Sequence, residues 1–197
     1  RRSSDLMRLF IACDFSSETL DKVAAVAREL RIALPGAPVR WVSSTNYHLT
    51  LQFLGELPLG KIEAIKAALR ELASNHRAIS LELAGAGCFP SLMQPQVIWL
   101  GIRPNPALIR LAEDIRRTLG SLGYKDESKF KAHLTLGRLD KFSTEEQKAR
   151  VGAKVALIKE SIIGADQFNE IILYRSILNP GGPVYTALFC QGKIEMS

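Results

Sequence analysis

The stretch His48-Leu49-Thr50-Leu51 decides the fold of this chain, because the same four residues return as His133-Leu134-Thr135-Leu136. A motif repeated around two of only three histidines is very improbable as a chance event. In an extended strand, side chains alternate between two faces, so each histidine shares a face with the threonine two residues later. The leucines lie on the opposite face. Each copy therefore predicts a strand whose leucines enter a core while an imidazole and a hydroxyl are presented together.

Elements of similar kind and order surround the two copies. Apolar periodicity predicts helices over about 16–33, 58–74, 108–119 and 143–158. Strands are predicted at about 9–14, 39–42, 47–54, 79–83, 97–102, 130–139, 168–174 and 184–190. We expect Gly55 to end the first motif strand and residues 85–95 to form a loop. The repeated order favours an α+β fold of two similar, pseudo-symmetric lobes with outer helices, each placing one motif strand beside a shared central cleft.

Composition sets limits on the class of protein. The 197 residues, 47% of them hydrophobic, suit one compact domain or two small lobes sharing a core. We expect residues 7–197 to form a single bilobal domain and residues 1–6 to be a leader or extension. The net charge of +6 mildly favours anionic partners such as phosphates or nucleic acid. No apolar run reaches the ~18 residues that a membrane span needs, so no membrane partner is expected.

The cysteines indicate the compartment. Cys13, Cys88 and Cys190 are odd in number and widely spaced, and no Cys-x-x-Cys motif is present. This pattern argues against a zinc site or a disulfide framework and favours a reducing compartment, which we take to be the cytoplasm. The third histidine, His76, lacks the motif, and we expect it near the end of a helix, facing the helix C-terminus or solvent.

Two histidines facing each other across a cleft can divide general acid–base work. Histidine has an unperturbed pKa of about 6.5, so near neutrality one imidazole can be neutral and the other protonated. The reaction that suits this pair is in-line displacement at phosphorus, in which one histidine deprotonates water and the other protonates the leaving oxygen. Thr50 and Thr135 would donate hydrogen bonds to the non-bridging oxygens. The scheme requires no metal, and no Asp-x-Asp or His-x-x-x-His ligand cluster is present.

Further segments carry a resemblance to a known family. They are Arg8-Leu9-Phe10-Ile11-Ala12, Arg40-Trp41-Val42, His48 through Gly55, Cys88-Phe89-Pro90, Phe130 through Arg138, Leu173-Tyr174-Arg175-Ser176 and Gly181 through Tyr185. Together they resemble the LigT-like RNA 2′,3′-cyclic phosphodiesterases of bacteria and archaea. These proteins are also called 2′-5′ RNA ligases and belong to the two-histidine phosphoesterase superfamily. The similarity spans residues 7 to about 185.

The resemblance implies antiparallel sheets around the cleft and a hydrolase that opens a 2′,3′-cyclic phosphate to a 2′-phosphate without a metal or other cofactor. On that pattern His48 matches the proton donor toward the 3′ oxygen, and His133 matches the proton acceptor that activates water. Thr50 and Thr135 match the phosphate binders, and Arg138 matches a basic residue that follows the second motif. The implied partner is RNA with a 2′,3′-cyclic phosphate or a 2′-5′ linkage, without an obligate protein partner. Reverse 2′-5′ ligation follows in principle.

Two residues depart from the family pattern. Ala132 stands where the family usually has proline, immediately before the second histidine. On a regular strand, Arg138 has the parity of Leu134 and Leu136, not that of His133. It therefore reaches the cleft only if a β-bulge or the end of the strand re-aims it.

Two other functions stay open. One keeps the site but changes the substrate to a small cyclic nucleotide or an ADP-ribose cyclic phosphate. The other is a non-catalytic module that binds RNA ends. Lys125, Lys129 and Lys131 attract RNA phosphates under the RNA-binding readings and otherwise form a solvated basic loop. Hydrolysis of an oligonucleotide that ends in a cyclic phosphate separates the binding module from both enzymes.

Overall fold

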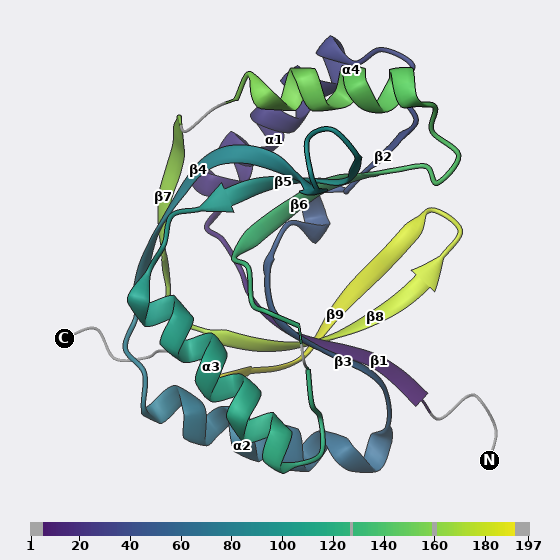
Figure 1. Ribbon diagram of the computed structural model, residues 1–197. Coiled ribbons are helices and arrows are strands. Elements are labelled where there is room, and N and C mark those ends of the chain that lie inside the picture. Colours follow the sequence, from purple (N-terminus) through teal and green to yellow (C-terminus); the bar gives the residue numbers. More distant parts are fainter. Residues whose placement is uncertain (1–5, 127, 159–160, 192–197) are drawn as a thin grey trace.

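Two antiparallel sheets build the protein, whose computed structural model describes residues 6–126, 128–158 and 161–191. The 4-stranded sheet has the order β3-β1-β8-β9 and consists of β3 (Leu49–Pro58), β1 (Leu6–Cys13), β8 (Ile171–Asn179) and β9 (Gly182–Gln191). The 5-stranded sheet has the order β2-β6-β5-β4-β7 and consists of β2 (Val39–Trp41), β6 (His133–Leu139), β5 (Pro95–Ile102), β4 (Ile79–Pro90) and β7 (Ile162–Phe168). One motif strand thus lies in each sheet (Figure 1).

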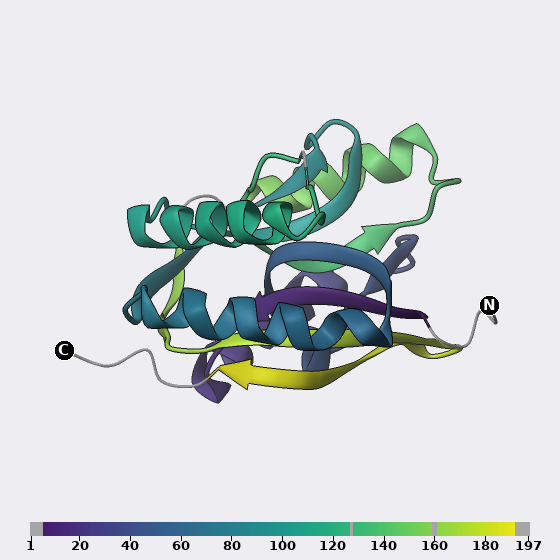
Figure 2. The ribbon, with the colours of Figure 1, turned by 90° about the horizontal axis from the view of Figure 1, so that it is seen from below.

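Helices cover the outside of both sheets (Figures 1 and 2). Helices α1 (Ser17–Ala33) and α4 (Glu145–Ala156) pack on the 5-stranded sheet, while α2 (Ile62–Ser74) and α3 (Pro106–Ser121) pack beside the 4-stranded sheet. Side-chain caps fix where three of them begin, from Ser16 for α1, Asn105 for α3 and Thr144 for α4. The predicted α+β fold of two lobes with outer helices is confirmed. No helix in the described part is long and apolar enough to cross a membrane.

The leucines of both motifs anchor the two sheets in the core. Leu49, Leu134 and Leu136 have no exposed surface, and Leu51 is 6% exposed. The histidines and threonines of the same motifs are only partly buried. The predicted alternation is therefore present in both copies, and burial of the leucines determines which way each His-Thr pair faces.

A β-bulge interrupts each motif strand at the same place. On β6, Gly137 pairs with Ile98 and Thr135 pairs with Trp99, which leaves Leu136 as the extra residue. On β3, the pairs of Gln52 with Ile11 and of Thr50 with Ala12 leave Leu51 as the extra residue. An extra residue inverts the alternation that follows it, so the fifth residue after each histidine returns to the face of that histidine. These two residues are Phe53 and Arg138.

Four sequence-based expectations were wrong. Gly55 does not end β3, because with φ of 75° it lies beside a further bulge and the strand continues to Pro58. The segment expected as a loop over 85–95 instead extends β4 to Pro90, paired with β5. Strand β7 was not expected, and β8 begins only at Ile171. The fourth correction concerns His76, whose Nε2 lies 2.8 Å from Asp114 Oδ2 and so joins the end of α2 to α3.

The division of the chain at residue 7 stays a prediction. Residues 1–5 lie outside the described part, and β1 begins at Leu6.

The contact between α4 and the β4–β5 connection yields a test of the packing. A Cβ added to Gly152 would overlap the backbone carbonyl of Leu92. Because backbone must move to admit it, we expect Gly152→Ala to lower the free energy of unfolding by about 1–3 kcal/mol. Urea unfolding measures the change. The matched control is Gly120→Ala in α3, where the added Cβ meets nothing within 4 Å and a gain of about 0.5–1 kcal/mol is expected. Equal stability of both variants would contradict the packing described.

Candidate active site

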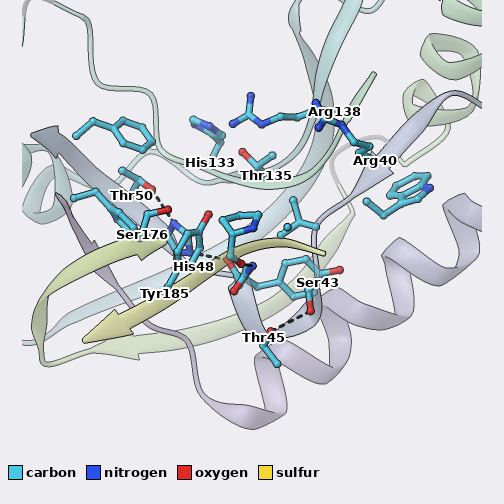
Figure 3. A pocket seen from close by; sticks show the side chains of 18 of the residues that line it. Arg40, Ser43, Thr45, His48, Thr50, His133, Thr135, Arg138, Ser176 and Tyr185 are labelled. Atoms are coloured by element: carbon cyan, nitrogen blue, oxygen red, sulfur yellow. Dashed lines mark hydrogen bonds between the residues drawn. The ribbon is translucent and has the colours of Figure 1, made fainter. Parts of the chain in front are cut away.

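A cleft of about 2110 Å³ opens between the two sheets, and both motifs line it. His48 directly precedes β3 and Thr50 lies at its start, while His133 and Thr135 come from β6. Figure 3 shows these four side chains around one space, with the β3 pair on one side and the β6 pair on the other. The β8–β9 hairpin forms a further wall through residues 178–185. The structure thus brings together the histidines and threonines that the sequence singled out.

The two imidazoles are held in the same way. Nδ1 of His48 lies 2.6 Å from the carbonyl oxygen of Asn46, and Nδ1 of His133 lies 2.6 Å from that of Lys131. A carbonyl oxygen only accepts hydrogen bonds, so each Nδ1 carries the hydrogen and donates it. In the neutral ring, Nε2 is then the acceptor nitrogen. Each histidine therefore has Nε2 as its basic nitrogen for proton transfer.

The loop before His48 is itself fixed. Residues Ser44–Asn46 form a 3-10 turn, and the Asn46 side chain donates a hydrogen bond of 2.8 Å to the carbonyl oxygen of Pro183. This bond ties the turn to the β8–β9 hairpin. The carbonyl that orients His48 is consequently held from two sides of the cleft.

The surroundings of the two rings differ. Phe10 stacks on His48 with ring centroids 5.0 Å apart. The ring of Tyr185 lies nearly perpendicular to that of His48, with centroids 5.1 Å apart. Nε2 of His48 also lies 3.0 Å from Oγ1 of Thr50, which can donate to the neutral ring. Among the described residues, the aromatic ring beside His133 is Phe89, which lies nearly perpendicular to it with ring centroids 4.9 Å apart. His48 is therefore the more enclosed imidazole.

Burial lowers the pKa of both histidines, but nearby charges act in opposite directions. Asp14 partly offsets the lowered pKa of His48, because a carboxylate favours the imidazolium. Arg138 and Lys131 lower the pKa of His133 further, because positive charges disfavour its protonation. The hydrogen bond from each Nδ1 to its carbonyl raises both pKa values. Among the charged neighbours, Asp14 thus favours protonation of His48, whereas Arg138 and Lys131 favour the neutral form of His133.

A tyrosine holds Asp14 in place. The hydroxyl of Tyr174 donates a hydrogen bond of 2.5 Å to Oδ2 of Asp14, and the ring of Tyr174 stacks on Phe10. Burial and the adjacent carboxylate raise the pKa of Tyr174, so the hydroxyl remains a donor. Sequence reasoning missed Phe10, Asp14 and Tyr174 as parts of the site, because they come from β1, its end and β8 and meet His48 only in the folded chain.

Basic side chains dominate the lining of the cleft. Among the described lining residues the basic ones are Arg8, Arg28, Arg31, Arg40, Arg116, Lys129, Lys131 and Arg138, and the acidic one is Asp126. The bulge at Leu136 brings Arg138 to the face of His133, so this predicted site residue does reach the cleft. No three His, Cys, Asp or Glu side chains of the described residues gather so that they could hold a metal ion. The cleft is suited to an anionic ligand.

A bilobal fold that contributes one His-x-Thr strand from each lobe to a shared basic cleft defines the class of two-histidine phosphoesterases. The model of the LigT-like phosphoesterase family matches residues 14–99 and 100–185. The chain belongs to this family. The two matched segments each contain one of the motifs.

Relatives and solved structures agree with this membership. The chain is 35% identical over 182 residues to an RNA 2′,3′-cyclic phosphodiesterase of Archaeoglobus fulgidus, covering 92% of this chain and 98% of the relative. It is 34% identical to an RNA 2′,3′-cyclic phosphodiesterase of Thermotoga maritima, covering 94% of this chain and 95% of the relative. Among solved structures, a Thermus thermophilus protein has a TM-score of 0.78 at 27% identity, covering 95% and 98%. Escherichia coli LigT, solved in complex with 3′-AMP, has a TM-score of 0.74 at 27% identity, covering 96% and 99%.

The opposite charges near the two imidazoles yield a direct titration test. We expect Asp14→Asn to lower the pKa of His48, because the variant removes the carboxylate that stabilises the imidazolium. We expect Lys131→Met to raise the pKa of His133, because it removes a repelling positive charge and keeps the backbone carbonyl. NMR titration of the Cε1 protons measures both values. Lys154→Met, on α4, is the matched control and should move neither. A shift of either histidine in the opposite direction would contradict the electrostatic difference.

Proposed function

We propose that the protein hydrolyses the 2′,3′-cyclic phosphate at the end of RNA to a 2′-phosphate, using His48 as proton donor and His133 as proton acceptor. The observation that carries the proposal is the pair of imidazoles in one basic cleft, each with Nδ1 held by a backbone carbonyl and Nε2 left as the basic nitrogen. The relatives named RNA 2′,3′-cyclic phosphodiesterase support the same reaction. Residues 7–197 would act as one bilobal unit.

The reaction is a single displacement at phosphorus. Nε2 of neutral His133 takes a proton from water as its oxygen bonds to phosphorus, and the bond from phosphorus to the 3′ oxygen breaks. Nε2–H of protonated His48 gives its proton to that leaving oxygen. The products are a 2′-phosphate and a 3′-hydroxyl. His133 then loses its proton to solvent and His48 regains one, which restores the starting state. Thr50, Thr135 and Arg138 would bind the non-bridging oxygens, where negative charge increases in the transition state.

The difference between the two rings supports this division of roles. Arg138 and Lys131 favour the neutral form of His133 that a base requires, and Asp14 favours the charged form of His48 that an acid requires. An anionic phosphate in the cleft raises the pKa of both imidazoles, because opposite charge stabilises the imidazolium. His48, which already has a carboxylate nearby, is then the ring that gains the proton.

The proposal also covers the reverse reaction, the need for a metal ion and the cellular compartment. A 5′-hydroxyl in the place of water would form a 2′-5′ linkage, so the same groups serve reverse 2′-5′ ligation. Both proton transfers use imidazoles, and the proposed reaction is therefore independent of metal ions. The three cysteines are free thiols, which supports a reducing, cytoplasmic compartment.

Leaving-group chemistry separates the roles of the two histidines. We expect His48→Ala and His133→Ala each to lower kcat on a cyclic-phosphate dinucleotide by about 10²–10⁴-fold, the usual contribution of one general acid or base. A phosphodiester with a much better leaving group needs little protonation, so it should restore activity to His48→Ala and not to His133→Ala. Steady-state kinetics on both substrates measure this, with circular dichroism to show that each variant is folded.

Rescue of His133→Ala instead would reverse the assigned roles. Near-normal activity of either folded variant on the dinucleotide would refute the paired-histidine mechanism. Binding of the dinucleotide without any hydrolysis by the wild type would favour a binding module.

A further inference from the structure

Two arginines stand directly opposite each other at the edge of the 5-stranded sheet. Arg40 of β2 pairs with Arg138 of β6, and both line the cleft. Side chains directly opposite in an antiparallel pair share a face and have Cβ atoms about 4.5–5.5 Å apart. Figure 3 shows the two arginine side chains next to each other, with Arg138 nearer to His133. The edge of the active-site cleft therefore carries a close pair of positive charges.

The protein does not neutralise this pair among its described residues. Like charges directly opposite on a sheet destabilise the pairing. Three arginines of the described part have a carboxylate partner, namely Arg8, Arg103 and Arg117. None of the ion pairs of the described residues includes Arg40 or Arg138. An anion bound between the two guanidinium groups would relieve the repulsion and match their planar fork of donors.

One cyclic phosphate does not use both arginines. A cyclic phosphodiester has a single negative charge and two non-bridging oxygens. Under the proposed function, Thr50, Thr135 and Arg138 already supply donors to those oxygens, beside two imidazoles. Arg40 lies one strand farther out, about 4.8 Å from β6 and on the edge strand of the sheet. Its charge is thus available to a second anionic group of the same substrate.

The chemistry of an RNA end identifies that second group. The terminal ribose carries the cyclic phosphate on its 2′ and 3′ oxygens and joins the chain through its 5′ oxygen. The next negative charge is the phosphodiester on that 5′ oxygen, which a mononucleoside 2′,3′-cyclic phosphate lacks. We propose that Arg40 binds this phosphodiester and makes the enzyme prefer oligonucleotide ends over mononucleotides. This inference rests on the proposed function and names the substrate class of the same site.

The test compares two substrates with wild type and two variants. The substrates are a diadenosine dinucleotide ending in a 2′,3′-cyclic phosphate and adenosine 2′,3′-cyclic phosphate. We expect Arg40→Ala to lower kcat/KM on the dinucleotide about 10–100-fold, the range for losing a charge-assisted hydrogen-bonded contact. The loss on the mononucleotide should be at least tenfold smaller. Arg150→Ala, an exposed arginine of α4 outside the cleft lining, is the matched control and should change neither value.

An uncharged linkage identifies the group that Arg40 contacts. Replacing the internucleotide phosphodiester by a methylphosphonate should lower the wild-type kcat/KM to about the value of Arg40→Ala, and the variant should be insensitive to the replacement. Equal losses on both substrates would place Arg40 at the reacting phosphate or in the fold, and would overturn the inference. Unchanged kinetics of Arg40→Ala on the dinucleotide would overturn it as well.

A binding measurement keeps this inference separate from the proposed reaction. Fluorescence anisotropy compares the dinucleotide ending in a 2′-phosphate with 2′-AMP, and neither needs turnover. We expect Arg40→Ala to weaken binding of the dinucleotide selectively, and to reduce its salt slope by about 0.7, the value for one lost phosphate contact in a single strand. Failure of the wild type to hydrolyse either substrate would refute the proposed function alone. Equal binding of the dinucleotide by variant and wild type would refute the phosphodiester subsite.

Discussion

Burial of the leucines next to the two histidines sets the geometry of the whole site. Leu49 and Leu134 each follow a histidine directly and have no exposed surface. Because strand side chains alternate, a leucine fixed in the core forces its histidine onto the other face, toward the cleft. A slip of one residue in either strand would expose the leucines and bury the imidazoles. The stability of the core and the geometry of the cleft are therefore set by the same two strands.

The two bulges give the pseudo-symmetric halves different chemistry. Each bulge returns the fifth residue after the histidine to the cleft face, and this residue is Phe53 in one half and Arg138 in the other. The aromatic and acidic neighbours of His48 contrast with the basic neighbours of His133. A repeated scaffold with unlike surroundings allows two identical side chains to hold different protonation states, as one acid and one base require.

Sequence reasoning predicted the features that follow from residue type and period. The repeated motif has a period of two and apolar residues on one side, which predicts that His48 and His133 each face away from the core, and the repeated order of elements around them predicts the shared cleft. That Arg138 points into the cleft could not be predicted from the residues of the strand, because a bulge depends on the register with β5 and not on local residue type. The extension of β4 past Gly85 was missed because glycine and alanine are poor strand formers. Packing decides this segment, where Gly87 lies directly beneath the ring of Trp99. The carbonyls that orient the histidines are backbone atoms, which residue identity does not reveal.

In the proposed mechanism, the two imidazoles carry both proton transfers without a metal ion and the cyclic phosphate loses its bond to the 3′ oxygen. Phosphorus NMR of the products formed from a dinucleotide ending in a 2′,3′-cyclic phosphate, with the enzyme kept in excess EDTA, shows both which oxygen leaves and whether a metal ion is needed. We expect a single product with a 2′-phosphate and a free 3′-hydroxyl, formed at the same rate as without the chelator. A 3′-phosphate product, or activity that is lost in EDTA and restored by a divalent ion, would contradict this mechanism.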